Sequence, residues 1–298
     1  MKLLSFYADG NLTVGVKTDA GVVDINAAAK TKGKAFDCPC GCGTKFGTES
    51  PLTMEAICWC GAAALAYVRE MADGSPVIDE AGIQFAPVMP NPEKIMCVGA
   101  NYACHSKEMG AEPPEIPVLF GKYKTALNCH NGTVVLPPAG EMYDYEAELV
   151  VVFGKVAKDV SVEDAMNYVF GYTIGNDVSM RKPLGRMAQW LTRKSPDGFG
   201  PVGPYIVLKD ELDGGNLPIK LYRNGVLKQD SNSSNLVFDI PTIISYASQY
   251  VTFKPGDLLF TGTPAGVIAG SADKDWLKAG EVLEVEIEGI GTLRNVIA

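Results

Sequence analysis

The sequence predicts an α+β fold that is mostly β, with a small N-terminal β/α domain followed by a larger catalytic domain. Beyond residue 86 the apolar segments are short and strand-like, as in ELVVVF at 148–153. Strands and helices do not alternate regularly, and the phosphate-binding pattern GxxxxGK[ST] does not occur, which argues against a doubly wound nucleotide-binding fold. We therefore expect the larger domain to be a closed or rolled-up β structure.

The N-terminal domain should begin with a short β-meander. Over residues 1–25 the apolar runs LLSFYA, LTVGV and VVDI are separated by two segments rich in Asp, Gly and Asn, which favour turns. A helix is expected near Met54–Asp73, where apolar residues recur at helical spacing, although Gly61 lies on the same face. Prolines 90 and 92 indicate a linker, so we place the two domains at residues 1–85 and 86–298.

Three local patterns stand out in the larger domain. Asn224-Gly225 predicts a tight turn in a hairpin over residues 217–229. Ser161 to Asp164 resemble a helix start, and Asp239 followed by Pro241 predicts a second helix over ISYASQY.

Composition and charge limit the classes of partner. A net charge of −9 argues against binding of nucleic acid or an anionic membrane surface, because the averaged field repels both. It leaves room for a small anionic substrate, since a bound cation and a few basic side chains reverse the sign locally. The first ten residues lack the apolar core of a signal peptide, and no stretch approaches eighteen apolar residues, so a cytoplasmic location is predicted.

The acidic cluster in DYEAEL is the first candidate site. Glu146 and Glu148 are two residues apart, so on an extended strand their side chains point to one face, and Asp144 precedes them. Asp177 follows about thirty residues later. Oxygen-only ligands suit Mg²⁺, Mn²⁺ or Ca²⁺ rather than zinc, and three carboxylates leave positions open for water or substrate. The alternative is a solvated strand edge with Asp144 in a turn.

A histidine and a glutamate form the second candidate site. His105 and Glu108 are three residues apart, so on one helical turn they face each other, and the carboxylate could orient the imidazole as a base. The alternative is a surface helix turn. The chain has only one other histidine, His130, which is expected at the surface without a role.

Two loops supply further candidates. Lys194 stands among glycines and prolines, which predicts a loop, and there it could balance the carboxylates and stabilise a developing oxyanion. A solvated loop lysine is the alternative. In TGTPAGV the Thr263 hydroxyl and the backbone amides could hold a carboxylate oxygen, or the segment could be a plain turn.

In their order, these blocks closely resemble the fumarylacetoacetate hydrolase family. The blocks are NYxxHxxE, PVLFGK, DYEAEL, GYTxxNDVSxR, QW, KSPD, GPxIV, NG, PGD and TGTPxGV, between residues 92 and 298. The resemblance implies a mixed β-roll or β-sandwich catalytic domain, usually dimeric, that binds Mg²⁺ or a similar cation. It implies metal ligands Glu146, Glu148 and Asp177 with Asp144 behind them, catalytic residues His105, Glu108 and Lys194, and substrate contacts from Arg181, Gln189 and Thr263.

The resemblance also implies a choice of reactions. The leading prediction is a hydrolase that cleaves a C–C bond in a small 2-oxo or 1,3-dicarbonyl acid, such as an acylpyruvate or fumarylpyruvate, with an enolate as leaving group. The alternative is an isomerase, tautomerase or decarboxylase of a keto diacid of the hydroxymuconate or oxaloacetate type. Leu184 stands where C–C hydrolases of the family often have the glutamine of DxSxRxxQ, a donor to the developing oxyanion, so hydrolysis is favoured only modestly.

A cysteine-rich segment departs from the family. Cys38, Cys40, Cys42, Cys58 and Cys60 lie within 23 residues, but CxCxC is not the CxxC pattern of common zinc ribbons. Free thiols in a reducing cytoplasm are therefore preferred over a zinc or iron–sulfur site. A protein of another class, which senses a ligand and carries metal or a redox function on these cysteines, is the non-enzyme alternative.

Overall fold

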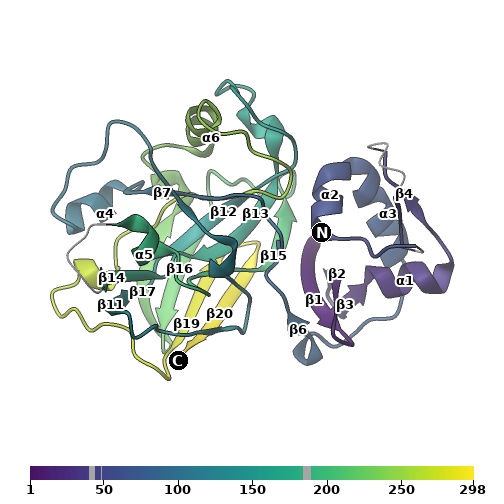
Figure 1. The fold of residues 1–298 in the computed structure, drawn as a ribbon, viewed down its shortest axis with the longest axis horizontal. Helices are drawn as coiled ribbons and strands as arrows, with labels where there is room; N and C mark the ends of the chain where they lie inside the picture. The colour runs from purple at the N-terminus through teal and green to yellow at the C-terminus, as the bar shows by residue number, and fades with distance from the viewer. Residues whose placement is uncertain (40–43, 48, 184–188) are drawn as a thin grey trace.

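The computed structural model describes residues 1–39, 44–47, 49–183 and 189–298, and it confirms a mostly β α+β fold. Figure 1 shows the N-terminal strands and helices gathered at one side of a larger body built of β-sheets. None of the described helices combines the length and apolar character needed to span a membrane.

The predicted N-terminal meander forms, with antiparallel strands β1 (Lys2–Ala8), β2 (Asn11–Thr18) and β3 (Gly21–Asp24). Helix α1 (Ile25–Lys32) begins at Asp24, whose carboxylate accepts hydrogen bonds from the amides of Asn26 and Ala27. A small hairpin of β4 (Phe36–Asp37) and β5 (Lys45–Phe46) follows, and after the helices β6 (Gln84–Phe85) pairs with β1.

The single helix predicted over residues 54–73 is wrong. Two helices occupy this segment, α2 (Met54–Cys60) and α3 (Ala62–Ala72). Gly61 separates them with φ of 53°, in the left-handed region that breaks a right-handed helix and that glycine adopts without steric cost. The chain therefore turns at the glycine, and the two helices pack against one another rather than forming one rod.

The main sheet continues from the N-terminal meander into the larger domain. Its strand order is β3-β2-β1-β15-β13-β12-β18-β7-β8. The new strands are β7 (Ile95–Gly99), β8 (Val118–Lys122), β12 (Ala147–Phe153), β13 (Val169–Asn176), β15 (Gly200–Leu208) and β18 (Leu258–Phe260). A short strand, β9 (Leu127–Asn128), pairs with β15. The junction between the two parts is the antiparallel pair β1 and β15, and the division at residues 85 and 86 stays a prediction.

A second sheet has the order β10-β20-β19-β16-β17. Its strands are β10 (Thr133–Val134), β16 (Pro218–Arg223), β17 (Val226–Asn232), β19 (Val282–Ile287) and β20 (Gly291–Ile297). The predicted hairpin is confirmed as β16 and β17, and Asn224 and Gly225 both have positive φ, as a tight hairpin turn requires. A separate pair joins β11 (Gly140–Asp144) to β14 (Ser179–Pro183).

Strand β12 has a continuous apolar sequence because it lies at the centre of the core, where both of its faces are covered. Leu149, Val151 and Phe153 pack with apolar residues of the second sheet. The alternate residues Val150 and Val152 pack in the cluster that includes the N-terminal helices. Because successive side chains on a strand point to opposite faces, a strand covered on both faces has to be apolar throughout. Polar residues at its beginning are therefore exceptional.

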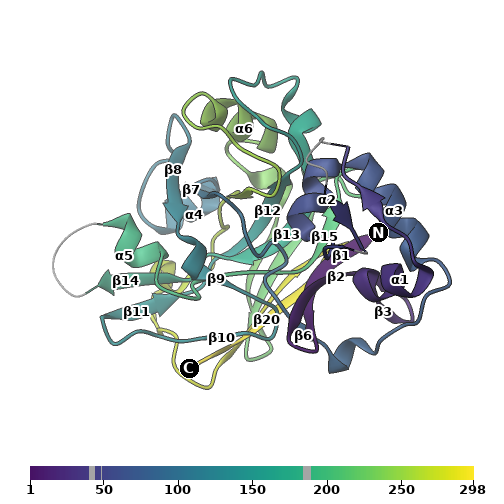
Figure 2. The ribbon, with the colours of Figure 1, turned by 45° about the vertical axis from the view of Figure 1, so that its right-hand side comes forward.

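The remaining helices are short and lie around the sheets (Figure 2): α4 (Ala103–Glu108), α5 (Trp190–Lys194) and α6 (Ile240–Ser248). Asp239 caps α6 as predicted, by accepting a hydrogen bond from the amide of Thr242. After Ser161 only a 3-10 helix forms, at Ala165–Tyr168. The prediction that Lys194 lies in a loop is wrong, because the glycines and prolines of this segment come after it and WLTRK forms one helical turn.

Candidate metal centre

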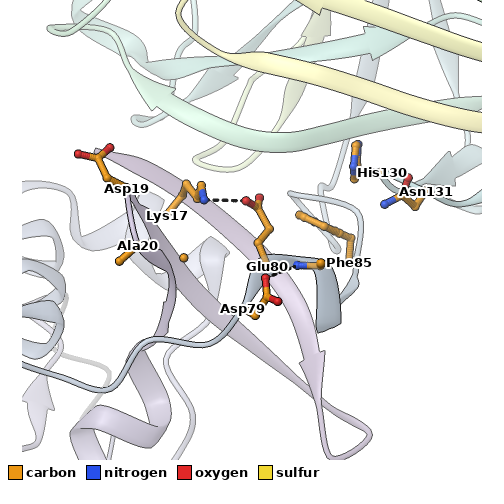
Figure 3. Close-up of a pocket in the computed structure, with 10 residues that line it drawn as sticks. Lys17, Asp19, Ala20, Asp79, Glu80, Phe85, His130 and Asn131 are labelled. Carbon is orange, nitrogen blue, oxygen red and sulfur yellow. Dashed lines mark hydrogen bonds and ion pairs between the residues drawn. The ribbon is translucent and has the colours of Figure 1, made fainter.

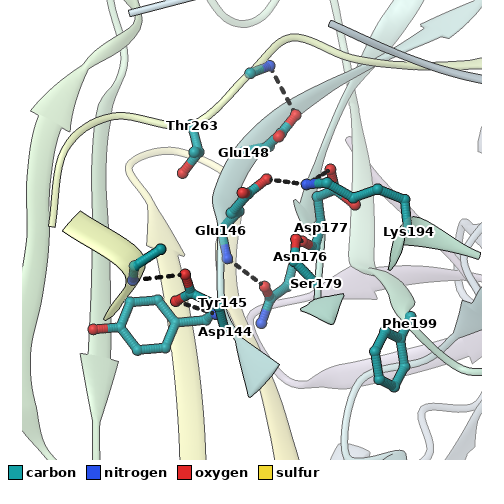
Figure 4. A network of polar contacts seen from close by, with 12 residues as sticks. Asp144, Tyr145, Glu146, Glu148, Asn176, Asp177, Ser179, Lys194, Phe199 and Thr263 are labelled. Atoms are coloured by element: carbon teal, nitrogen blue, oxygen red, sulfur yellow. Dashed lines mark hydrogen bonds and ion pairs between the residues drawn. The ribbon is translucent and has the colours of Figure 1, made fainter. Parts of the chain in front are cut away.

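Three predicted ligands meet at the beginning of β12 (Figure 4). Glu148 lies on this strand and Glu146 immediately precedes it. Asp177 directly follows β13, the antiparallel neighbour whose Asn176 is paired with Ala147. One carboxylate oxygen from each of the three lies within 4.8 Å of the others. The exposed fractions of the residues are 4 % for Glu146, 1 % for Glu148 and 0 % for Asp177. The alternative of a solvated strand edge is therefore wrong.

The environment of Glu148 shows that a bound cation would stabilise this cluster. Its carboxylate accepts a hydrogen bond from the neutral amide of Gly262 at 2.7 Å. Burial, reinforced by the neighbouring carboxylates of Asp177 and Glu146, raises the pKa of Glu148 well above its ordinary value. A cation bound between the three side chains would offset this repulsion, and three buried carboxylate oxygens are a donor set that fits a hard divalent ion.

Asp144 lies behind the ligands. It ends β11 rather than β12, so its side chain leaves the cluster and accepts hydrogen bonds from the amides of Ile268 and Ala269 at 2.8 and 3.0 Å. Arg181 donates to Asp144 at 2.9 Å and to Glu146 at 2.6 Å. Arg181 therefore lies between these carboxylates, where it holds Glu146 in position, and its predicted contact with substrate stays a prediction.

Removing the Asp144 carboxylate should destabilise the fold. In Asp144→Ala the partly buried Arg181 would lose one partner and two buried or partly buried backbone amides would lose their acceptor, so we expect the free energy of unfolding to fall by about 3–5 kcal/mol. Urea denaturation followed by circular dichroism measures this. The matched control is Glu141→Ala on the same strand, which removes an exposed ion pair with Lys182 and should cost less than about 1 kcal/mol. Equal losses in the two variants would contradict the account.

Two lysines offset part of the negative charge of the carboxylates. The Nζ atom of Lys194 lies 2.5 Å from Glu146 and 2.6 Å from Asp177. Burial lowers the pKa of Lys194, but the Asp177 and Glu146 carboxylates outweigh burial and raise it, so the ammonium form is stabilised. Lys122 is not among the site residues that the sequence predicts. It lies 2.6 Å from the other oxygen of Asp177 and donates to the carbonyl of Phe199 at 2.9 Å. The only hint of this role in the sequence is that Lys122 is the lysine of the PVLFGK block, at the end of β8.

The charged groups of the cluster nearly balance one another. Four buried carboxylates, from Asp144, Glu146, Glu148 and Asp177, are balanced by three cations, from Lys122, Arg181 and Lys194. With all four carboxylates ionised, the cluster by itself carries one net negative charge. A divalent ion would make the site positive overall, and a positive buried site attracts an anionic ligand despite the negative charge of the whole chain.

The histidine–glutamate pair forms as predicted. On α4 the Nδ1 atom of His105 lies 2.8 Å from an oxygen of Glu108. The other oxygen of Glu108 accepts a hydrogen bond from the amide of Gly266 at 2.9 Å, which docks α4 on the loop that follows β18. With Nδ1 engaged by Glu108, the Nε2 atom is the one left to accept a proton. Burial raises the pKa of Glu146, but the charges of Lys194, Arg181 and, to a smaller extent, the nearby His105 outweigh burial and lower it.

Thr263 lies at the cluster, and Gln189 lies at the surface. The Thr263 hydroxyl accepts a hydrogen bond from Gln229 at 2.9 Å, and Gln229 also accepts one from the amide of Ala147 at 2.9 Å. Gln229 is fully buried and ties the TGTPAGV loop to β12, a role that its sequence context does not signal. Gln189 is exposed immediately before α5. Leu184 lies outside the described residues.

His130 belongs to a different part of the molecule. It was expected at the surface, but it is half-buried, its ring meets Phe85 edge to face at 4.8 Å, and its Nδ1 accepts a hydrogen bond from the amide of Arg294. Burial lowers the pKa of His130. It lines a cavity of about 500 Å³ together with the ion pair Lys17–Glu80 (Figure 3). None of the three clustered carboxylates lines this cavity.

The chain is similar to known proteins in both sequence and structure. The family model described as fumarylacetoacetate (FAA) hydrolase C-terminal matches residues 94–298. Oxaloacetate tautomerase FAHD2B, mitochondrial, from Bos taurus is 37% identical over 305 residues, covering 100% of this chain and 91% of that protein. The solved structure of fumarylacetoacetate hydrolase from Exiguobacterium antarcticum has a TM-score of 0.80 at 30% identity, covering 100% of this chain and 99% of that one.

A further solved structure bears on the metal. Maleylpyruvate hydrolase from Sphingobium sp. SYK-6, in complex with manganese (II) ion and pyruvate, has a TM-score of 0.79 at 29% identity and covers 100% of this chain and 99% of its own. The family match spans the segment that carries the carboxylates, the histidine and the lysines described above. The chain belongs to the fumarylacetoacetate hydrolase family.

Proposed function

We propose that the protein is a divalent-metal-dependent tautomerase that interconverts the keto and enol forms of a small 2-oxo dicarboxylic acid of the oxaloacetate type. The observation that carries this proposal is the buried trio of Glu146, Glu148 and Asp177 with the His105–Glu108 pair close to it. A metal site and a base together suit removal of a proton from carbon next to a carbonyl group. The similarity to oxaloacetate tautomerases over the whole chain supports the substrate class.

Glu146, Glu148 and Asp177 would hold the cation, and Mg²⁺ or Mn²⁺ suits three carboxylate oxygens. When bound, such an ion supplies a Lewis acid that polarises a carbonyl oxygen. The manganese in the maleylpyruvate hydrolase structure supports a divalent ion, and Mg²⁺ is our proposal for the resident one.

The protein's own groups would move the proton. His105 Nε2 accepts the proton from the carbon between the carbonyl and the distal carboxylate, while Glu108 holds the imidazole through Nδ1. The same imidazolium then donates a proton to the carbonyl oxygen, which becomes the enol hydroxyl, so the reaction is balanced without water. The ammonium of Lys194 stabilises negative charge that develops on oxygen during the transfer. Thr263 is placed to contact a substrate carboxylate.

C–C bond hydrolysis, our leading prediction from the sequence, becomes the second candidate. The maleylpyruvate hydrolase structure favours it, because that protein shares the fold and was solved with pyruvate. Hydrolysis needs a water molecule as well as the base, whereas tautomerisation needs the base alone. The tautomerases also match this chain at higher sequence identity.

A substrate panel separates the two candidates. Purified protein with added Mg²⁺ or Mn²⁺ would be assayed with enol-oxaloacetate, maleylpyruvate, fumarylpyruvate and acylpyruvates, with the products identified by mass. We expect the highest kcat/KM for the enol-to-keto conversion of oxaloacetate, with no change of mass. Faster release of pyruvate from an acylpyruvate would select hydrolysis, and turnover of neither group would overturn both candidates.

Two other predictions accompany this function. A homodimer is proposed from the family resemblance, and light scattering of the eluted peak in size-exclusion chromatography measures it. A cytoplasmic location also stays a prediction. The Bos taurus relative is named as mitochondrial, so fractionation of the source cells has to distinguish between these two compartments.

A further inference from the structure

Two parts of the molecule take no part in the proposed reaction: the cysteine-rich segment and the surface around β8. Cys40 and Cys42 lie outside the described residues. The Sγ atoms of Cys38 and Cys60 lie 3.0 Å apart, and Cys58 is fully buried among the apolar residues of α2 and α3. The preference for thiols over a zinc or iron–sulfur site therefore stays a prediction.

Strand β8 is the last strand of the main sheet (Figure 2). It pairs with β7 on one side, and no described strand pairs with it on the other. Its sequence VLFGK has a single charged residue, Lys122, and the ammonium of this lysine is turned into the metal centre. Proteins usually pair or cover an apolar edge strand of this kind, because its open side is a template for another chain.

Exposed apolar side chains surround this strand. Trp190 packs on Phe120 of β8 with ring centroids 4.8 Å apart. The indole of Trp190 and the side chain of Val118 both come within 3.6 Å of the position that a Cβ atom on Gly99 would take, so they are neighbours. We define the β8 face by the six large apolar residues of this region that are between 37 % and 67 % exposed: Ile116, Val118, Tyr123, Trp190, Leu191 and Tyr250.

Two cavities make the β8 face continuous. One of about 470 Å³ is lined by Phe120 and Tyr250, and one of about 430 Å³ is lined by Tyr123 and Leu191. No charged residue of the described chain lines either cavity, although 20% of all residues in the sequence are charged. Exposed aromatic residues without charges among them are typical of the centre of a protein–protein interface.

Gly121 of β8 also indicates a close partner. Its φ is not in the left-handed region, and a Cβ atom on it would meet only the carbonyl oxygen of Ile95, at an ordinary contact distance of 3.5 Å. Neither the backbone conformation nor the packing of the chain itself therefore requires glycine here. A glycine inside a strand often marks a place where another backbone approaches closely.

The charges at the two ends of β8 indicate that this partner is a second copy of the chain. Glu115 precedes the strand and Lys124 follows it, and both side chains are exposed without an ion pair to any described residue. A two-fold axis across the middle of β8 reverses the direction of the strand in the second copy. It therefore brings the acidic end of each strand against the basic end of the other, and the surface is complementary to itself.

We propose that two copies of this chain dimerise through the β8 face around a two-fold axis near Phe120, so that Glu115 meets Lys124 of the partner subunit. The face adjoins the metal centre, because the Phe120 ring lies 5.4 Å from the Nζ atom of Lys194 and Lys122 extends from the end of β8 to Asp177. A second copy seated there supports the strand that carries Lys122. The proposal does not depend on the tautomerase reaction.

A charge exchange tests this arrangement. Light scattering of the full chain with Mg²⁺, measured over a dilution series, gives the Kd of the dimer, and the wild type should have twice the mass of one chain. Glu115→Lys and Lys124→Glu should each raise the Kd at least about tenfold, because both ion pairs across the axis become like-charge contacts. The double variant Glu115→Lys/Lys124→Glu restores opposite charges and should return to within about threefold of the wild-type Kd.

An apolar position within the face gives a second test. Tyr123→Asp should be monomeric, because it buries a charge at the interface. The matched control Val226→Asp, an equivalent change of an exposed apolar residue at the start of β17, should stay dimeric. Circular dichroism checks the fold of each variant, and if Tyr123→Asp does not fold, the exposed charge variants still decide.

Three results would each overturn the proposal. The first is a wild type that is monomeric throughout the dilution series, which would leave the β8 face to a different protein. The second is a dimer whose Kd is unchanged in folded Tyr123→Asp. The third is a pair of charge variants that the double variant does not rescue. Tautomerase activity of the wild type is measured separately, so failure of this proposal is distinct from failure of the proposed function.

Discussion

Glu148→Gln is expected to lose metal-dependent turnover, with kcat/KM lower by at least about 10³-fold, because one of three ligands is gone and the ion supplies several kcal/mol of charge stabilisation. The variant should still fold. Glu148 is buried beside two other carboxylates, so in the absence of an ion its charge costs free energy, and the amide removes that cost while keeping the shape.

Two measurements separate loss of metal from loss of fold. Isothermal titration with Mg²⁺ or Mn²⁺ should give clear binding to the wild type and none to Glu148→Gln. Thermal unfolding should show that the ion raises the Tm of the wild type and leaves that of the variant unchanged. The matched control Glu286→Gln, on the exposed face of β19, should behave like the wild type in both. Full activity of Glu148→Gln after stringent removal of metal would contradict the assignment.

His105→Asn should lower kcat by about 10²–10⁴-fold while its affinity for the divalent ion stays within about twofold of the wild type. The reason is that His105 moves the proton but is not a ligand, so the carboxylates remain intact. Glu108→Gln should have a smaller effect, about 10–100-fold, because Glu108 orients the imidazole and docks α4 on the loop at Gly266. Steady-state kinetics and metal titration on the same samples measure both quantities.

The second histidine gives the control for this experiment. His130→Asn alters a half-buried histidine outside the carboxylate cluster, and it should leave kcat and KM unchanged. If His105→Asn turned over oxaloacetate at the parent rate, a different base would have to be found. If it lost metal affinity together with activity, the histidine would belong to the metal site, and the division of roles proposed here would be wrong.

The sequence could predict those features that depend on local spacing. The meander at β1–β3, the hairpin at Asn224-Gly225 and the shared face of Glu146 and Glu148 follow from turn chemistry and from the period of two along a strand. The His105–Glu108 contact follows from one helical turn. In each case the interacting residues lie close together in the chain, so the geometry of a single element determines the contact.

Contacts between distant segments could not be predicted in this way. Arg181 joins Asp144 to Glu146 because β14 pairs with β11, and Lys122 reaches Asp177 from the end of β8. Gln229 lies on an ordinary hairpin strand and becomes part of the site only through the packing of β17 near β12. These residues look like ordinary polar positions until the sheet order is known, and they supply much of what neutralises and orients the carboxylates.

On our proposal, a divalent ion held by Glu146, Glu148 and Asp177 is required for the tautomerase activity of this protein. The most direct test follows the ultraviolet absorbance of enol-oxaloacetate in protein stripped of divalent ions and then titrated with Mg²⁺ or Mn²⁺. We expect only the uncatalysed rate in the stripped protein, and an increase in rate that saturates near about one ion per chain. An unchanged fast rate in the stripped protein, or no acceleration at any ion concentration, would contradict it.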